Sequence, residues 1–466
     1  LAFSSGESWL NVNDIYTSES TVVSNAFTEY ARSTMPFFLI EGRYEGETTG
    51  TEVVARAQGY QASLSGASGH IYGNNPVWLF ASGWQSALDA PGAATLQYDA
   101  GGHGYLKSVL DGLGISPTSQ VLVFSQTSFQ ASHINGANPR AIYFNDNVAV
   151  AFIRGAPLLE VAAQDPSLGT VFYQLSQTEG PGPHLSRSDQ CLSCHLSWDT
   201  RAVPGPFVLS TFPRKTDREY ANGGMTDARE PFDRRWGGWY VTGAEVPRRH
   251  MGNQALIGPH AADPEHTPPP PALTSLAGST LVRDIGDYLT PYSDIVALLV
   301  LDHQLHAYNL MTRAGWEHKL AVYPATPAAS DLLSARVRDA VEELVEYLLF
   351  VDEAPLGQVK GSSGFTEWFA AQGPRDDQGR SLRELQLSKR LMKYPLSYTI
   401  YSVTFDGMPA AVRDATYKRL AEVLTATRPD AKFAHLTAAD RRAVLEILRA
   451  TKPDFKPFAD ATAAAR

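Results

Sequence analysis

The sequence predicts an α+β protein in two parts, and three patterns indicate this fold class. Short apolar runs alternate with helical stretches through the first hundred residues, which is a βαβ pattern. Strand-like runs bounded by turn residues follow between residues 120 and 152. From residue 293 onward, apolar residues recur at helical spacing. We therefore expect domains at residues 1–100 and 101–466, the second with short β elements early and mainly α-helices late.

The N-terminal part is expected to hold three strands separated by two helices. The strand-like runs cover residues 9–14, 37–40 and 70–73, and the helical stretches cover residues 21–34 and 53–64. The Pro-Gly pair at residues 91–92 and the Gly-Gly pair at residues 101–102 then interrupt the pattern. We place the domain boundary in this region.

The second part is expected to begin with strands and to end with helices. Strand-like runs at residues 141–144 and 148–152 flank Asn145-Asp146-Asn147, which predicts a hairpin, and a further run covers residues 120–124. Helices are predicted at residues 293–314, 330–351, 382–393, 409–424 and 437–450. Thr437 is the expected N-cap of the last helix.

The composition is that of a folded globular protein. Hydrophobic residues make up 43% and charged residues 19% of the 466 residues, which allows substantial cores. The longest apolar run, residues 295–301, is too short to span a bilayer. A formal net charge of −10 argues against a nucleic-acid partner and favours a basic protein as any redox partner.

The most informative motif contains the only two cysteines of the chain, in the run Cys191-Leu192-Ser193-Cys194-His195. This spacing is typical of c-type haem attachment, because one turn places both thiols where each can form a thioether to a haem vinyl group. The adjacent imidazole then reaches the iron. The motif predicts one covalent haem c, attached through Cys191 and Cys194 and ligated by His195.

Three other uses of the two cysteines stay open. A redox dithiol normally follows an apolar strand, whereas the polar, Pro-rich residues 180–184 precede this motif. A structural zinc site would need further ligands from histidines or carboxylates. A disulfide across two intervening residues would be strained.

The ligand on the other side of the iron decides between two functions. Two strong protein ligands favour electron transfer, whereas an open sixth position favours a haem enzyme of peroxidase or oxygenase type. In steps of 100° per residue from Ile295, both His303 and His306 fall on the apolar stripe of the predicted helix. We expect His303 to be the sixth ligand. The alternative is a core histidine hydrogen bonded to Asp302 or Asn309.

The loop at residues 248–253 offers a second source of ligands. His250 or Met251 could bind the iron, while Arg248 and Arg249 could instead pair with the haem propionates. Met225, in a Gly-rich segment, is a third option. The aromatic residues Trp198, Trp236, Trp239 and Tyr240 are expected to line the haem.

The first part of the chain, about residues 1–97, resembles the C-terminal part of an apiosidase-like glycoside hydrolase barrel, of the family labelled putative collagen-binding. The matching motifs cover residues 38–45, 56–60, 66–73 and 88–93. The resemblance implies a partial β/α barrel in which Glu41 stands where the family has its nucleophile. Asp14 and Glu45 do not occupy the place of the family's acid, so we expect no glycosidase activity.

The remainder, about residues 104–466, resembles uncharacterised, secreted single-haem cytochromes c of environmental bacteria. The matching residues are 124–130, 138–146, 191–195, 235–243, 250–253 and 394–398. The resemblance implies a cytochrome c-type haem domain but no particular reaction. Because covalent haem attachment in bacteria takes place outside the cytoplasmic membrane, we expect a periplasmic or secreted protein.

Overall fold

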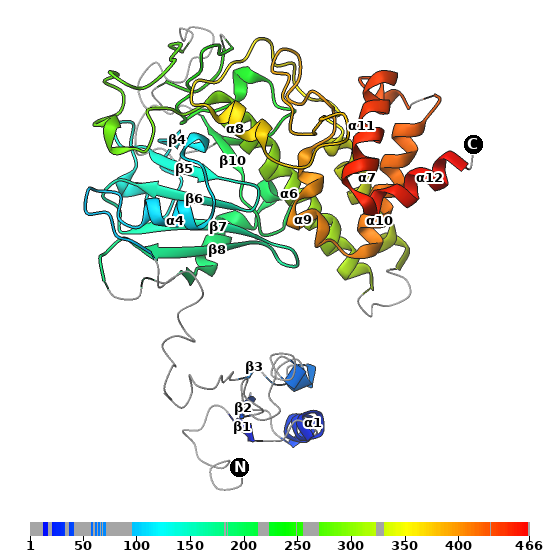
Figure 1. The fold of residues 1–466 in the computed structure, drawn as a ribbon. Helices are drawn as coiled ribbons and strands as arrows, with labels where there is room; N and C mark the ends of the chain where they lie inside the picture. The colour runs from blue at the N-terminus through cyan, green and yellow to red at the C-terminus, as the bar shows by residue number, and fades with distance from the viewer. Residues whose placement is uncertain are drawn as a thin grey trace. The chain divides into compact units, whose positions relative to one another are not determined.

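The structure is a computed structural model in which the chain forms two units, Leu1–Thr95 and Leu96–Arg466 (Figure 1). The division lies close to the boundary expected near residue 100. The structure describes residues 13–16, 21–32, 37–41, 57–58, 61–62, 64–65, 67, 69–70, 96–180, 183, 185–212, 223–247, 249–254, 270–322, 330–428 and 430–464.

The first unit contains a short parallel sheet in the order β1-β2-β3. Its strands are β1 (Asn13–Tyr16), β2 (Phe37–Glu41) and β3 (Gly69–His70), and helix α1 (Val22–Arg32) connects the first two. Apolar side chains of α1 and β2 form a small core, which includes Val22, Ala26, Phe37 and Leu39. The predicted βαβ pattern is confirmed, and residues 9–12 of the first expected strand lie outside the described residues. Residues 71–73 of the third expected strand lie outside the described residues.

The second unit is built on a six-stranded antiparallel sheet in the order β4-β5-β6-β7-β8-β9. The strands are β4 (Val121–Val123), β5 (Arg140–Phe144), β6 (Val148–Ile153), β7 (Leu158–Asp165), β8 (Gly169–Ser176) and β9 (Ser186–Arg187). The hairpin predicted around Asn145-Asp146-Asn147 is confirmed as β5 and β6. The longest strands, β7 and β8, are additional to the predicted set.

The two faces of this sheet have different neighbours, because successive side chains of a strand alternate between faces. Tyr143, Val150 and Leu159 belong to the core that includes Leu106 and Leu110 of helix α4 (Leu106–Gly112). Phe144 and Val121 instead belong to the core around helix α6 (Ile295–Val322). The sheet therefore lies between one short helix and one long one (Figure 1).

Helix α6 is buried around its whole circumference over most of its length. It contacts strands β8 and β10 and the helices α7, α8, α9 and α10. Its buried residues include the polar side chains Asp302, His303, Gln304, His306 and Asn309. The sequence predicted an apolar stripe with one solvent face, but the surrounding elements cover every side of the helix.

The remaining elements complete the second unit around α6 (Figure 1). They are α5 (Leu192–His195), the antiparallel pair β10 (Val208–Thr211) and β11 (Gly223–Thr226), α7 (Ser330–Leu348), α8 (Phe365–Ala371), α9 (Val403–Asp406), α10 (Ala410–Thr425), α11 (Ala438–Thr451) and α12 (Lys456–Ala464). In the part of the chain that the structure describes, no helix is long and apolar enough to cross a membrane.

Two local predictions had opposite outcomes. Thr437 caps α11 as expected, since its side chain accepts a hydrogen bond from the backbone N–H of Asp440 at 3.0 Å. The helix predicted at residues 382–393 is wrong, because this segment folds back on itself with an isolated bridge between Leu385 and Met392. The backbone N–H of Lys393 donates to the carbonyl of Glu384 at 2.7 Å, which closes the turn. Apolar periodicity alone does not distinguish such a turn from a helix.

Candidate haem-binding site

The cysteine motif forms a short helical turn at the end of the sheet. A 3₁₀ turn (Asp189–Cys191) leads directly into α5. The backbone N–H of Ser188 donates to the carbonyl of Phe172 at 2.9 Å, which fixes the turn to strand β8. Both thiols are free, Cys191 half-buried and Cys194 exposed. Burial raises the pKa of Cys191, so its thiol is protonated at neutral pH.

The side chain of His195 is held by one backbone carbonyl. Its Nδ1 lies 3.1 Å from the carbonyl oxygen of Gly205, and the Gly205 N–H donates to the His195 carbonyl at 2.9 Å. This contact places the proton on Nδ1 and leaves the lone pair on Nε2. Within the described part of the chain, Nε2 has no hydrogen-bond partner. A histidine ligand commonly has this arrangement, with its second nitrogen bonded to a carbonyl.

Burial also keeps this imidazole neutral. The pKa of His195 is lowered to about 4, chiefly because burial disfavours the charged ring. The Gly205 carbonyl and Glu160 act in the opposite direction, and the nearby Arg140 adds to the lowering. The ring can therefore bind a metal at neutral pH without first losing a proton.

Apolar surface surrounds the motif. The rings of Phe172 and Phe207 lie 4.7 and 5.6 Å from the His195 ring, between centroids. Leu196 and Trp198 follow the motif and are 44% and 92% exposed. Both side chains are therefore accessible to a group bound beside the motif.

The sheet face beside the motif carries small side chains. Ala151 is opposite Glu160 in the register of β6 and β7, and Ala162 is opposite Phe172 in that of β7 and β8. Both alanines are only partly buried. Two free thiols and a neutral imidazole with an open nitrogen are the groups that a covalently attached haem would use.

Two of the three alternatives can be compared with the structure, while a redox dithiol stays open because free thiols are compatible with it. Among the described residues, no group of three or more His, Cys, Asp or Glu side chains could hold a metal ion, so a zinc site finds no further ligands there. The two cysteines are not joined in a disulfide.

His303 does not have the surroundings expected of the sixth iron ligand. Its Nε2 lies 2.6 Å from the hydroxyl oxygen of Ser397. The rings of Tyr347 and Phe350 stack on it, with centroids 5.0 and 4.6 Å away. The side chain is fully buried, and a porphyrin would have to open this core to reach it. The geometry corresponds to the alternative of a core histidine, with Ser397 as partner instead of Asp302 or Asn309.

Of three other candidates, His306 and His250 are buried and Met251 is partly buried. His306 Nε2 is 3.4 Å from the carboxylate of Asp227, and neither ring nitrogen makes a hydrogen bond. His250 is 4% exposed and packs edge-on against Trp236. The sulfur of Met251 accepts a hydrogen bond from the Ser210 hydroxyl at 3.6 Å.

Met225 has a different environment. It is opposite Leu209 in the register of β10 and β11, whereas the neighbouring pair, Val208 and Thr226, points into the core around α6. Because side chains alternate, Met225 and Leu209 share the other face of this pair, where Phe207 also lies. Phe207 packs against His195, so this face lies toward the cysteine motif. Met225 is partly buried.

The aromatic residues expected around the haem separate into two groups. Trp198 lies beside the motif. Trp236 and Trp239 are core residues, whose indole N–H groups donate to Asp302 at 3.0 Å and to the Leu209 carbonyl at 2.8 Å. The Tyr240 hydroxyl donates to the carbonyl of Gly136 at 2.7 Å. These three rings stabilise the fold.

Sequence reasoning missed the residues that contact His195 from a distance in the chain. Gly205, Phe172 and Phe207 carry no motif, although the run Pro204-Gly205-Pro206 signals a rigid turn. Arg140 was also missed; its Nη1 lies 3.4 Å from the Glu160 carboxylate, while its Nε is buried without a partner. Of the expected arginine pair, Arg249 is exposed and Arg248 lies outside the described residues.

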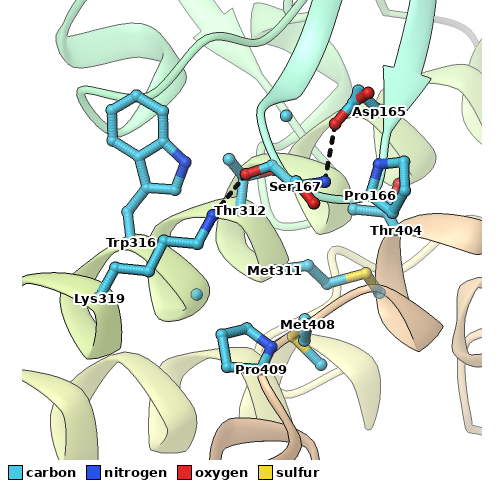
Figure 2. A pocket seen from close by; sticks show the side chains of 12 residues that line it. Asp165, Pro166, Ser167, Met311, Thr312, Trp316, Lys319, Thr404, Met408 and Pro409 are labelled. Carbon is cyan, nitrogen blue, oxygen red and sulfur yellow. Dashed lines mark hydrogen bonds between the residues drawn. The ribbon is translucent and has the colours of Figure 1, made fainter. Parts of the chain in front are cut away.

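A small pocket lies elsewhere in the unit, between the β7–β8 turn, α6 and the start of α10 (Figure 2). Lys319 Nζ donates to the Ser167 carbonyl at 2.5 Å, and the Ser167 N–H donates to the Asp165 carboxylate at 2.8 Å. Both charged side chains are thus engaged by the chain itself. We interpret the pocket as a packing defect beside Met311 and Met408.

In the first unit, Glu41 is the last residue of β2 and pairs with Tyr16. It therefore stands at the carboxyl end of a parallel strand, as expected. Asp14 does not end β1, because it pairs with Phe38 within the strand. Glu45 lies outside the described residues.

Comparison with known families gives one match, which lies in the first unit. Residues 2–101 match the family model described as "Apiosidase-like, catalytic domain", about a fifth of the chain. Searches of curated proteins and of solved structures found no match. The resemblance of the N-terminal part is confirmed, and the cytochrome resemblance of the second part stays a prediction.

The buried state of His303 predicts a pH-dependent stability. Burial, aided by His306 and Arg229, lowers the pKa of His303 to about 3, whereas an unfolded histidine titrates near 6.5. The stability that the neutral ring preserves is therefore fully present above pH 6.5 and is lost as the pH falls toward 3. From pH 7.5 to pH 5 this residue alone should cost about 2 kcal/mol of unfolding free energy.

The measurement is urea unfolding of the protein and of His303→Leu at both pH values. Burial raises the pKa values of Asp302 and Glu353 to about 7, so these groups add stability as the pH falls and oppose the effect of His303. Subtracting the unfolding free energy of the variant from that of the protein removes this contribution, because both proteins contain Asp302 and Glu353. Between pH 7.5 and pH 5, the unfolding free energy of the protein should fall by about 2 kcal/mol relative to that of the variant. A gap that does not change with pH would contradict the assignment of a neutral, buried ring.

Proposed function

We propose that the second unit is a c-type cytochrome that binds one haem through Cys191 and Cys194, with His195 as an iron ligand. The observation that carries the proposal is the contact between His195 Nδ1 and the Gly205 carbonyl, 3.1 Å apart, which leaves Nε2 open beside two free thiols. When bound, the haem supplies reversible one-electron chemistry. The chain's own residues hold the imidazole neutral, fix its orientation and provide apolar surface.

Attachment can be tested by haem staining after denaturing electrophoresis of protein made in a host competent in cytochrome maturation. We expect the full chain to stain and the double variant Cys191→Ala/Cys194→Ala to lose the stain, because its haem has no thioether. Ser193→Ala is the matched control, since it changes an exposed residue between the two cysteines. An unstained full chain, or equal staining of the double variant, would refute the proposal.

We further propose electron transfer as the activity, with Met225 as the second axial ligand in place of His303. Among the candidates, Met225 lies on the face that Phe207 shares. A His–Met pair raises the reduction potential of haem iron. A haem enzyme of peroxidase or oxygenase type is the alternative if the sixth position is open.

The ferric optical spectrum distinguishes these cases. The protein should be low-spin and should bind cyanide slowly, while Met225→Ala should become high-spin and bind cyanide at once, because its sixth position is open. Met251→Ala should keep the parent spectrum, since its sulfur is engaged by Ser210. A high-spin parent protein would favour the enzyme, and an unchanged Met225→Ala spectrum would exclude this ligand.

Two properties follow as further proposals. The net charge of −10 favours a basic redox partner. Covalent haem attachment favours a periplasmic or secreted location.

A carbohydrate-related role of the first unit is the second candidate function. The family match over residues 2–101 favours it, together with the position of Glu41 at the carboxyl end of β2. Barrel ligands gather at that end of the strands. Hydrolysis needs a second carboxylate about 5 to 9.5 Å away, and Asp14 lies inside β1 instead of at its end. We propose weak sugar binding without hydrolysis.

We expect no release of reducing sugar from branched plant glycans. Incubation of the full chain with such glycans, followed by a reducing-sugar assay, checks this, with Glu41→Gln and Asp14→Asn in parallel. Hydrolysis by the full chain that disappears in Glu41→Gln and persists in Asp14→Asn would show that the unit is a working glycosidase.

A further inference from the structure

Helix α6 supports the loop that orients His195. Asn309, which is 1% exposed, donates from Nδ2 to the carbonyl of Pro206 at 2.9 Å. Pro206 is adjacent to Gly205, whose carbonyl faces His195 Nδ1. The buried amide of Asn309 on α6 therefore holds the loop in which the preceding carbonyl, that of Gly205, contacts the imidazole.

Each carbonyl of the run Pro204-Gly205-Pro206 has a separate partner. The Pro204 carbonyl accepts from the Thr170 N–H at 3.0 Å, the Gly205 carbonyl faces His195, and the Pro206 carbonyl accepts from Asn309. Strand β8, the cysteine motif and α6 thus each hold one residue of the loop. Since proline fixes its own backbone angle, little freedom remains for the Gly205 carbonyl.

The packing explains why residue 205 is a glycine. A Cβ on Gly205 would lie 1.8 Å from Asn309 Oδ1, much closer than any real contact. The backbone angle of Gly205 is not in the left-handed region, and the three atoms nearest to such a Cβ all belong to Asn309. The glycine lets the asparagine approach the loop closely.

We propose that Asn309 is a positioning residue that tunes the iron through the Gly205 carbonyl. This inference rests on the proposed haem attachment at Cys191, Cys194 and His195. A firm hydrogen bond from Nδ1–H to a carbonyl makes the imidazole a more basic ligand, which favours ferric iron and lowers the reduction potential. Loosening the loop weakens that bond and raises the potential.

The test is the midpoint potential of the haem-loaded full chain and its variants, from spectroelectrochemical titration. Asn309→Ala should retain the haem and raise the potential, with a change of roughly tenfold in the redox equilibrium constant, or about 59 mV for one electron. Asn309→Leu keeps most of the side-chain volume and should give the same shift if Asn309→Ala folds poorly.

A pair of variants at Gly205 separates positioning from packing. Gly205→Ala should load little haem, because its methyl group meets Asn309. Gly205→Ala/Asn309→Ala should regain the haem, since the space is free, and should keep the raised potential. If Asn309 had only a structural role, the double variant would not combine regained haem with a raised potential.

Gln304→Ala is the matched control. Gln304 lies on the same helix, is buried and donates to the Asn145 carbonyl at 2.9 Å, at the hairpin turn instead of the His195 loop. It should lose stability but keep the parent potential. A parent-like potential in both Asn309 variants, or an equal shift in Gln304→Ala, would overturn the inference. A full chain without haem would instead refute the proposed function, and this inference with it.

Discussion

The burial of polar side chains on α6 is the constraint on which the second unit depends. A buried donor or acceptor without a partner costs about 1–3 kcal/mol, and three of these side chains meet a group from another element. Gln304 reaches the hairpin turn, Asn309 reaches the His195 loop, and Asp302 accepts from the indole of Trp236. The helix thereby fixes the positions of the sheet, of the β10–β11 pair and of the loop beside the cysteine motif.

The same constraint explains how far the sequence could predict the site. The spacing of Cys191, Cys194 and His195 is a local signal, and it identifies the motif without knowledge of the fold. The role of a histidine on α6 is not local, because it depends on which element covers it. Helical periodicity correctly placed His303 in the interior, but only the fold brings Ser397, ninety-four residues away, to its ring. The contacts of Gly205 and Phe207 with His195 could not be predicted from the sequence for the same reason.

The elements of the fold follow a similar division. The β5–β6 hairpin and the Thr437 cap depend on residues adjacent in the chain, and both were predicted. The segment at residues 382–393 has helical spacing, yet its backbone closes a turn in which Lys393 donates to Glu384. In the first unit, the βαβ pattern and the position of Glu41 were predicted, while Asp14, expected at the end of the first strand, lies inside β1.

The central claim is that Cys191 and Cys194 both bind one haem, and mass spectrometry of the tryptic peptide of residues 188–201 tests it most directly. This peptide contains both cysteines and His195 and is bounded by Arg187 and Arg201. The account predicts that the peptide from protein matured with haem carries the mass of one haem, which reduction does not release. An unmodified peptide with two alkylatable thiols would contradict the account.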